Sequence, residues 1–255
     1  MFWLIPLVQT HIFFVVAGSK ERANVHFYSG KLILWIEFGG NEMKVLYVYA
    51  HPEPKSFNGA LKDTALAALQ EKGHEVKLSD LYAMKFHPVL KPSDFPERKN
   101  LEVFNPFLEA IKAVKTGAFS PDIKEEMEKV KWADLLIFQF PIYFTAMPAI
   151  MKGWIDRVLA PGFGFDPVTN SAYDTGLFKG KSAMLVATTG APKELYSEGG
   201  AHGDLNRHLE SITHCVFEFM GMKVLPSYII YEVSSMSRER GAEELEKYKQ
   251  RLLEL

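Results

Sequence analysis

Short apolar runs alternate with longer amphipathic stretches along the chain from residue 43 onward. The apolar runs predict five strands, at residues 44–50, 75–79, 135–140, 182–188 and 224–230. Helices are predicted at residues 57–72, 122–132 and 148–158, from about residue 204 to 220, and from residue 238 to the end. Prolines interrupt residues 82–121, where no element is predicted.

Strands that alternate with helices indicate an α/β fold, because parallel neighbouring strands need a crossover connection and such crossovers are right-handed. The pattern predicts one doubly wound parallel sheet of five strands in the order 2-1-3-4-5, the flavodoxin-like arrangement. In such open sheets a ligand lies outside the carboxyl ends of the strands. The loops at these strand ends are therefore candidates for a binding site.

The helix predicted at residues 148–158 carries an apolar stripe of Met151, Trp154 and Ile155. This stripe fits either a subunit interface or the face of the sheet.

The first 42 residues do not follow the alternating pattern. Residues 1–18 are apolar, but they contain Pro6, Gln9 and His11. They also lack the basic residues that come before the apolar core of a secretory signal. The second apolar run, residues 32–38, is too short to span a membrane. We therefore expect an N-terminal extension outside the fold, produced by a misassigned start codon ahead of Met43, and no stable membrane insertion. Residues 43–255 are expected to form the functional domain.

The composition restricts the possible partners. The 255-residue chain has a net charge of −2 and no basic stripe, so nucleic acid is not expected as a partner. The single cysteine, Cys215, cannot form an internal disulfide, which is typical of a reducing compartment and predicts a cytoplasmic location. Cys215 has no neighbouring cysteine, and no metal site is expected. A buried apolar position on the helix at residues 209–220 is favoured for Cys215 over a catalytic thiol.

Polar residues gather between the first strand and the first helix. The N–H groups at the helix start, the Ser56 hydroxyl and the Asn58 amide form a candidate anion site. Helix capping explains Ser56 and Asn58 equally well, and His51 could be only a turn residue. The segment lacks both the glycine-rich dinucleotide fingerprint and the P-loop lysine, which disfavours a NAD-binding Rossmann domain and an NTPase.

Two later loops suggest a flavin. A flavin ring needs a flat apolar surface on one face, hydrogen bonds to its polar edge, and an open second face for a reaction partner. Tyr143 and Phe144, which follow the third strand, could supply the surface, and the turn at residues 188–190 could supply the edge contacts. Aromatic residues at a strand end, however, more often belong to the core.

Seven segments occur in a distinctive order: residues 51–58, 80–84, 120–123, 138–141 (Phe-Gln-Phe-Pro), 148–154 (Pro-Ala-Ile-Met-Lys-Gly-Trp), 188–190 (Thr-Thr-Gly) and 196–204. Together they resemble the NAD(P)H:quinone oxidoreductase (DT-diaphorase) family of flavoproteins over about residues 44–231. The resemblance implies a homodimer with FAD in a cleft at the subunit interface. It also implies a ping-pong reaction, in which NADH or NADPH reduces the flavin, leaves, and is replaced by a quinone substrate.

The resemblance assigns roles to individual positions. It implies that the FAD diphosphate and ribityl chain are held by His51, Ser56, Phe57 and Asn58. Asn105 stands where the family has a glutamine that also reaches FAD. The flavin ring would be bound by Pro141, Ile142, Tyr143, Phe144 and Thr145 from one loop, and by Thr188, Thr189, Gly190 and Ala191 from another. Tyr196, which also contacts the flavin, and His202 match the catalytic pair.

Flavin chemistry gives this pair a role. A hydride that arrives at flavin N5 leaves negative charge on the N1/O2 edge, which a nearby hydroxyl stabilises. The resemblance implies Tyr196 as this donor, backed by the His202 imidazole, which can give a proton near neutral pH. Without the family match, His202 would be interpreted as a surface or capping histidine.

Some positions depart from the best-known family members. These have Trp and Phe where this chain has Phe144 and Thr145, and a glycine in place of Ala191. The loop at residues 163–173 lacks the closely spaced tyrosine pair that covers the substrate from the partner subunit; Phe165 and Tyr173 are the nearest candidates for that role. These changes alter the wall of the substrate pocket. The preference between NADH and NADPH, or the use of either, stays open.

Two alternative functions remain. The nearer one is an FMN-dependent azo or nitro reductase, or a channel-regulating flavoprotein subunit, of the same fold. The match of residues 82–123 to the FAD-using branch disfavours this alternative. The other is a flavodoxin-type electron carrier, which the net charge of −2 disfavours because such carriers are strongly acidic.

Overall fold

The computed structural model describes residues 22–28, 31–37 and 42–255. The chain divides into two compact units, Met1–Glu42 and Met43–Leu255. In the first unit, strands β1 (Arg22–Tyr28) and β2 (Lys31–Glu37) pair as an antiparallel hairpin, which the sequence pattern did not predict. The apolar segment at residues 1–18 lies outside the described residues. That the first unit is an extension outside the functional domain stays a prediction.

The second unit is built on a parallel sheet with the spatial order β4-β3-β5-β6-β7, in which β8 also pairs with β6. Its strands are β3 (Lys44–Tyr49), β4 (Glu75–Asp80), β5 (Leu135–Pro141), β6 (Ser182–Thr188), β7 (Lys223–Val224) and β8 (Tyr228–Ile230). The predicted flavodoxin-like order 2-1-3-4-5 is confirmed. The fifth predicted strand, however, is divided into β7 and β8, because Pro226 between them has no N–H group to donate to the ladder.

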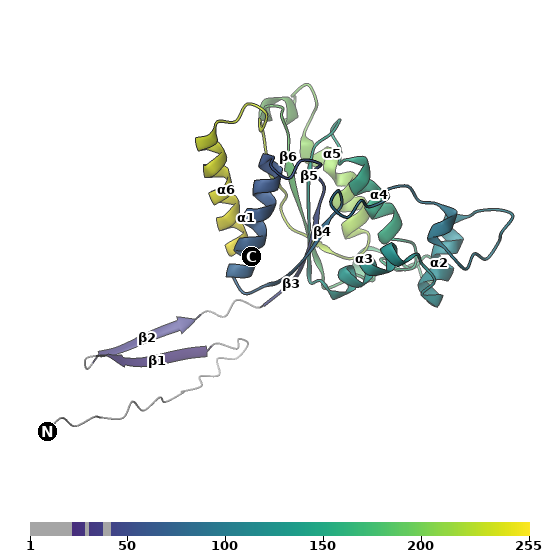
Figure 1. The fold of residues 1–255 in the computed structure, drawn as a ribbon, viewed down its shortest axis with the longest axis horizontal. Helices are drawn as coiled ribbons and strands as arrows, with labels where there is room; N and C mark the ends of the chain where they lie inside the picture. Colours follow the sequence, from purple (N-terminus) through teal and green to yellow (C-terminus); the bar gives the residue numbers. More distant parts are fainter. Residues whose placement is uncertain (1–21, 29–30, 38–41) are drawn as a thin grey trace. The chain divides into compact units, whose positions relative to one another are not determined.

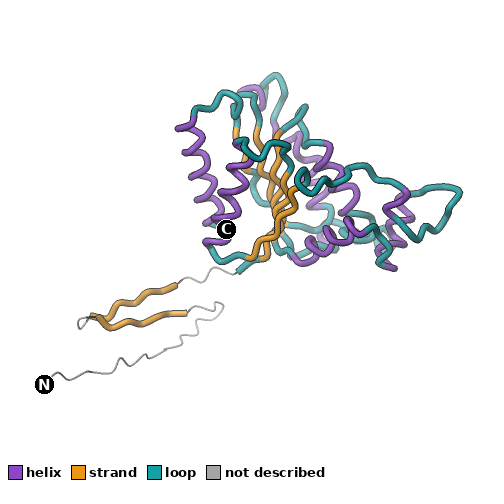
Figure 2. The backbone as a smooth tube through the Cα atoms, viewed as in Figure 1, coloured by secondary structure: helices purple, strands orange, loops and turns teal. Residues whose placement is uncertain are grey.

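Helices cover both faces of this sheet (Figures 1 and 2). Figure 1 shows α1 (Phe57–Glu71) and α6 (Arg238–Leu253) on one face, and α3 (Pro121–Trp132), α4 (Ala149–Val158) and α5 (Leu205–Ile212) on the other. Short 3-10 turns occur at Pro92–Asp94, Tyr173–Thr175 and Lys193–Tyr196. Of the described helices, none combines the length and the apolar character needed to cross a membrane.

The two sides of the sheet have separate hydrophobic cores. Leu61 of α1 and Leu252 of α6 pack in the core on one side. Met151, Trp154 and Ile155 of α4 are at most 4% exposed and pack in the core on the other side. The apolar stripe of α4 therefore faces the sheet and not a subunit interface.

Helix α2 (Pro106–Thr116) was not predicted, although its boundary signals are present in the sequence. Asn105 caps its start, with Oδ1 accepting from the backbone N of Leu108 at 3.1 Å, and Gly117 ends it at a φ of 70°. The large apolar residues Phe107 and Leu108 are 44% and 48% exposed, so the apolar pattern does not mark the buried face of this helix. The prolines before it further concealed the pattern.

The helix predicted from about residue 204 to 220 changes its winding part-way. Beyond α5 it continues as a π-helical segment, Thr213–Glu218, in which the backbone N of Phe219 donates to the carbonyl of His214 five residues earlier, at 3.1 Å. The wider turn moves the inward-facing position to Phe217, which is buried. Cys215 is consequently exposed, and the prediction that it is buried was wrong.

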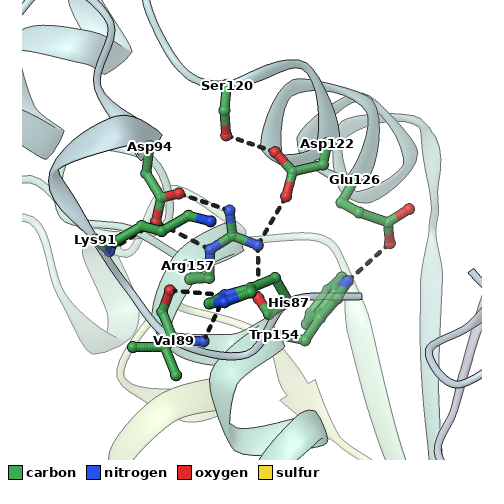
Figure 3. Close-up of polar contacts among 9 residues, drawn as sticks. All are labelled: His87, Val89, Lys91, Asp94, Ser120, Asp122, Glu126, Trp154 and Arg157. Carbon is green, nitrogen blue, oxygen red and sulfur yellow. Dashed lines mark hydrogen bonds and ion pairs between the residues drawn. The ribbon is translucent and has the colours of Figure 1, made fainter. Parts of the chain in front are cut away.

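Arg157 of α4 bonds to the segment at residues 82–121, which also buries Phe86, Phe95 and Phe119 in the core (Figure 3). Its Nε and Nη2 donate to the Asp94 carboxylate at 3.0 and 2.8 Å, and its Nη1 donates to the carbonyl of His87 and pairs with Asp122, each at 2.8 Å. The side chains of Arg157 and Asp94 are each 1% exposed. Burial alone would lower the pKa of Arg157, but its bonds to Asp94 and Asp122 outweigh this effect and raise it.

Replacement of Asp94 by alanine should lower the free energy of unfolding by about 3–5 kcal/mol, because it leaves the Arg157 guanidinium buried with one carboxylate fewer. Urea denaturation of the full chain measures this loss. The matched control is Asp156→Ala, which breaks the exposed ion pair between Lys152 and Asp156 and should cost less than about 1 kcal/mol. Equal losses in the two variants would show that Asp122 and the His87 carbonyl satisfy Arg157 without Asp94.

Candidate active site

Three loops meet at the carboxyl edge of the sheet. They follow β3, β5 and β6, which are neighbours in the sheet. The chain order reverses between β3 and β5, because β4 lies on the other side of β3. Such a switch point leaves a crevice where ligands bind in this class of fold.

The loop after β3 leads into the N-terminus of α1. Oγ of Ser56 accepts from the backbone N of Gly59 at 3.2 Å, so Ser56 is the helix cap, and Nδ1 of His51 lies 3.0 Å from the same hydroxyl oxygen. A Cβ on Gly59 would lie 1.9 Å from the carbonyl oxygen of Pro54, so only glycine allows the loop to fold back over the helix start. The structure thus gives Ser56 a capping role and His51 a turn role. Their contact with a diphosphate stays a prediction.

Asn58 and Thr188, both predicted to bind the cofactor, contact each other. They are 4% and 0% exposed, and Nδ2 of Asn58 donates to Oγ1 of Thr188 at 2.9 Å. The Thr188 carbonyl accepts from the backbone N of Ile142 at 2.7 Å. The two side chains therefore connect the first turn of α1 to the end of β6. Their contacts with a flavin stay a prediction.

The loop after β5 contains a strained two-residue turn. The backbone groups of Tyr143 and Ala146 exchange hydrogen bonds at 2.9 and 3.1 Å, and Phe144 and Thr145 between them have φ values of 46° and 62°. These values are those of a type I′ turn, which favours Asn-Gly and strains a bulky or β-branched residue. The side chain of Phe144 is fully exposed, and that of Tyr143 is 46% exposed. Two aromatic side chains thus remain uncovered at the switch point, as a planar ligand would require.

The turn after β6 is held by its own backbone. Oγ1 of Thr189 accepts from the N of Ala191 at 3.2 Å, and the Ala191 carbonyl accepts from the N of Glu232 at 3.1 Å. A Cβ on Gly190 would lie 2.6 Å from Oγ of Ser234, so a larger residue here would require the Ser234 hydroxyl to move. Thr189 is 5% exposed and Gly190 is exposed, so the contact surface of this turn is mainly backbone.

The predicted catalytic pair is brought together. The rings of Tyr196 and His202 lie 5.1 Å apart between centroids, with Tyr196 buried and His202 exposed. The backbone of His202 is fixed on both sides: its N donates to the carbonyl of Leu195 at 2.9 Å, and its carbonyl is 2.5 Å from Nε2 of His208. A cavity of about 250 Å³ adjoins this loop, lined by Glu198, Gly199, Gly203, Asp204, Arg207 and His208.

The remaining predicted residues lie elsewhere in the chain. Phe165 and Tyr173 both pack against Phe219, with ring centroids 5.0 and 5.4 Å away, so they form one aromatic cluster beside the π-helical segment. Asn105 caps α2. That Phe165 and Tyr173 contact the substrate, and Asn105 the cofactor, stays a prediction.

Residues 43–255 match the family model described as a flavodoxin-like fold. The chain is 45% identical over 201 residues to the ribosyldihydronicotinamide dehydrogenase (quinone) of Homo sapiens, which covers 78% of this chain and 86% of that protein. It is 42% identical over 210 residues to NAD(P)H dehydrogenase (quinone) 1 of Rattus norvegicus, covering 82% and 76% respectively. The chain belongs to the NAD(P)H:quinone oxidoreductase family. The resemblance inferred from the sequence motifs, and with it the assignment to the oxidoreductases, is confirmed.

A solved structure agrees with this family membership. A crystal structure from Klebsiella pneumoniae assigned as a quinone reductase is 42% identical, has a TM-score of 0.78, and covers 83% of this chain and 84% of that one.

Two features of this quinone oxidoreductase family member were missed from its sequence. One is Gln139, a buried amide on the otherwise apolar strand β5, for which its isolated position in Leu135–Pro141 was the available signal. The other is a groove of about 330 Å³ beside Phe57, which also involves Val233, Met236, Ser237, Arg238, Gly241, Ala242 and Leu245. No sequence signal could locate the groove, because it forms only when α6 packs next to α1.

Thr145→Gly should raise the free energy of unfolding of the ligand-free protein by about 1 kcal/mol, because glycine relieves a left-handed conformation that costs a β-branched residue about 1–3 kcal/mol. Thermal or urea unfolding measures the gain. Ala146→Gly in the same turn has no positive φ to relieve and should lose about 0.5–1 kcal/mol instead. A loss in both variants would contradict strain at Thr145.

Proposed function

We propose that this protein is an FAD-dependent NAD(P)H dehydrogenase that reduces quinones by two electrons with ping-pong kinetics. The observation that carries the proposal is the turn after β5 at the switch point of the sheet, where Tyr143 and Phe144 are uncovered and Phe144 and Thr145 have strained backbones. Strain of this kind persists where function requires a conformation that the sequence disfavours. The names of the relatives, which are quinone-dependent dehydrogenases of reduced nicotinamides, support the reaction class.

The residues present fit a flavin dinucleotide. Tyr143 and Phe144 offer a flat apolar surface for the ring, and the exposed backbone of Gly190 is available to its polar edge. The α1 N-terminus, which no acidic residue occupies in its first turn, suits a diphosphate.

The groove beside Phe57 supports FAD over FMN. It begins at the first residue of α1, where the diphosphate would lie, and it is lined mainly by apolar side chains of the β8–α6 connection and of α6. A flat adenine fits a groove of this size and polarity, whereas FMN has no group to place there.

A bound flavin would supply a two-electron carrier between NADH or NADPH and the quinone, whose reduction to the hydroquinone also takes up a proton. The protein contributes position and charge. The Tyr196 hydroxyl would donate to the polar edge of the flavin, and the exposed His202, whose ring lies beside that of Tyr196, would supply the proton. Phe165 and Tyr173 of the second subunit of a homodimer would cover the quinone.

The proposal is tested by identifying the flavin released from the purified full-length protein by chromatography. The native protein is then mixed anaerobically with NADH or NADPH, followed by a small benzoquinone. FAD whose oxidised absorbance is lost in one phase and restored by the quinone is the expected result. Release of FMN would favour the azo or nitro reductase alternative, and a flavin indifferent to quinones would favour the electron carrier.

His202→Ala should leave FAD bound but slow its reduction by NAD(P)H about 100-fold, which is the typical contribution of a positioned acid–base group. Anaerobic stopped-flow absorbance measures the rate. The matched control is His87→Ala, an exposed histidine that bonds locally to the backbone of Val89 and should leave the rate unchanged. Equal rates in wild type and His202→Ala would refute the catalytic assignment.

Gly241→Leu should weaken FAD binding about 10- to 100-fold and leave FMN binding within about twofold, because overfilling a well-formed site costs about 1–3 kcal/mol. A Cβ on Gly241 would lie 3.8 Å from the Phe57 ring, so the larger side chain projects into the groove without an initial clash. Leucine also favours the helix more than glycine does, which protects the fold. Flavin fluorescence titration measures both affinities, with the exposed Glu243→Leu as control. Equal weakening of FAD and FMN would exclude the groove as an adenine site.

A further inference from the structure

A chain of buried polar side chains runs beneath the three loops of the site. At its centre, Gln139 of β5 is completely buried. Its Nε2 donates to the backbone carbonyl of Asn58 at 2.7 Å, and its Oε1 accepts from the Tyr47 hydroxyl at 2.5 Å. The Tyr47 hydroxyl in turn lies 3.1 Å from that of Tyr248 on α6. None of these three side chains has a role in the reaction described above.

The hydrogen bonds around Gln139 close into a circuit. Gln139 binds the backbone of Asn58 in the first turn of α1, and the Asn58 side chain binds Thr188 at the end of β6. The Thr188 carbonyl accepts from the N of Ile142, which lies three residues beyond Gln139 on the same stretch of chain. The circuit therefore joins the starts of all three loops of the site through bonds shielded from water.

The Asn58 carbonyl and the Tyr47 hydroxyl determine how the Gln139 amide is oriented. Burial raises the pKa of Tyr47 and of Tyr248, so both hydroxyls keep their protons. Tyr47 donates its proton to Oε1 of Gln139, and its oxygen is then free to accept from Tyr248. A flipped amide would turn Oε1 toward the Asn58 carbonyl and leave two oxygens facing each other without a proton between them. Only one orientation satisfies every group, which is the condition for a rigid buried network.

We propose that Gln139 is a positioning residue of the flavin site: by holding the first turn of α1 to the loops after β5 and β6, it sets their spacing before the cofactor binds. The inference rests on the proposed function for the identity of the cofactor. The circuit itself is made by residues of this chain alone. Gln139 would thus act on the flavin through Asn58 and Ile142, without touching it.

The test compares three variants of the full-length protein. Gln139→Met keeps the length of the side chain and removes both polar groups. Tyr248→Phe removes only the outermost hydroxyl and leaves the bond between Tyr47 and Gln139 in place. Val130→Ala shortens a completely buried side chain of α3 on the other side of the sheet. It lowers the stability of the protein without altering the circuit of hydrogen bonds.

Two quantities are measured: the dissociation constant for FAD, and the hydrogen exchange rate of the Ile142 amide in the flavin-free protein. Gln139→Met should weaken FAD binding at least about 10-fold, which is typical when a supporting partner of a binding residue is lost. It should also speed exchange at Ile142, but not at Ser182, whose N donates to the Asp134 carbonyl at the opposite end of β6. Tyr248→Phe and Val130→Ala should keep the FAD dissociation constant within about twofold of wild type, although both lower the melting temperature.

The proposal is overturned if the Gln139→Met variant binds FAD as tightly as the Val130→Ala variant. It is also overturned if the hydrogen exchange rate of the Ile142 amide does not change in Gln139→Met. The same holds if all three variants fall on one line of affinity against stability, because FAD binding would then follow overall stability alone. A wild-type protein that binds no flavin removes the proposed function and this inference together. If the wild type binds FAD and Gln139→Met binds it equally well, only the inference is removed and the proposed function stands.

Discussion

Every residue of β5 is buried, and a polar atom on this strand must therefore find its partner inside the protein. The strand lies between β3 and β6 and is covered by helices on both faces. Its single polar side chain, Gln139, is satisfied by Tyr47 and by the start of α1. The buried amide is thus bonded to the helix whose N-terminus lies at the edge of the proposed cofactor site. Stability of the core and geometry of the site are consequently coupled in one set of hydrogen bonds.

A second buried polar cluster integrates the segment between β4 and α3. This stretch has a long irregular course, and its helix α2 exposes large apolar side chains. It is held by apolar side chains buried in the core, such as Phe86, Phe95 and Phe119, and by the bonds of Arg157 to Asp94 and to the His87 carbonyl. A guanidinium group suits this task, because its planar fork reaches a carboxylate with two parallel bonds and still has a donor for a carbonyl.

The proposed site combines rigid and strained parts. The loops after β3 and β6 are tied down by buried side chains and by glycines in close contact with neighbouring backbone or side-chain atoms. The turn at Phe144 and Thr145, by contrast, holds two unsuitable residues in left-handed conformations at the surface. A rigid cradle beside a strained aromatic turn is the arrangement expected where a planar ligand is held on one side and a second molecule enters on the other.

The sequence by itself determined the fold class and strand order, because buried parallel strands appear as short apolar runs and their crossovers have one allowed hand. It also located the three loops, since these follow directly from the strand ends. It did not reveal α2, whose large apolar residues are exposed, or the exposure of Cys215, which depends on a π-helical turn. It identified Asn58 and Thr188, but only the tertiary structure decided that they bind each other, because 130 residues separate them along the chain. The groove beside Phe57 likewise exists only once α6 has packed near α1, since a surface shared by distant segments has no local pattern in the sequence.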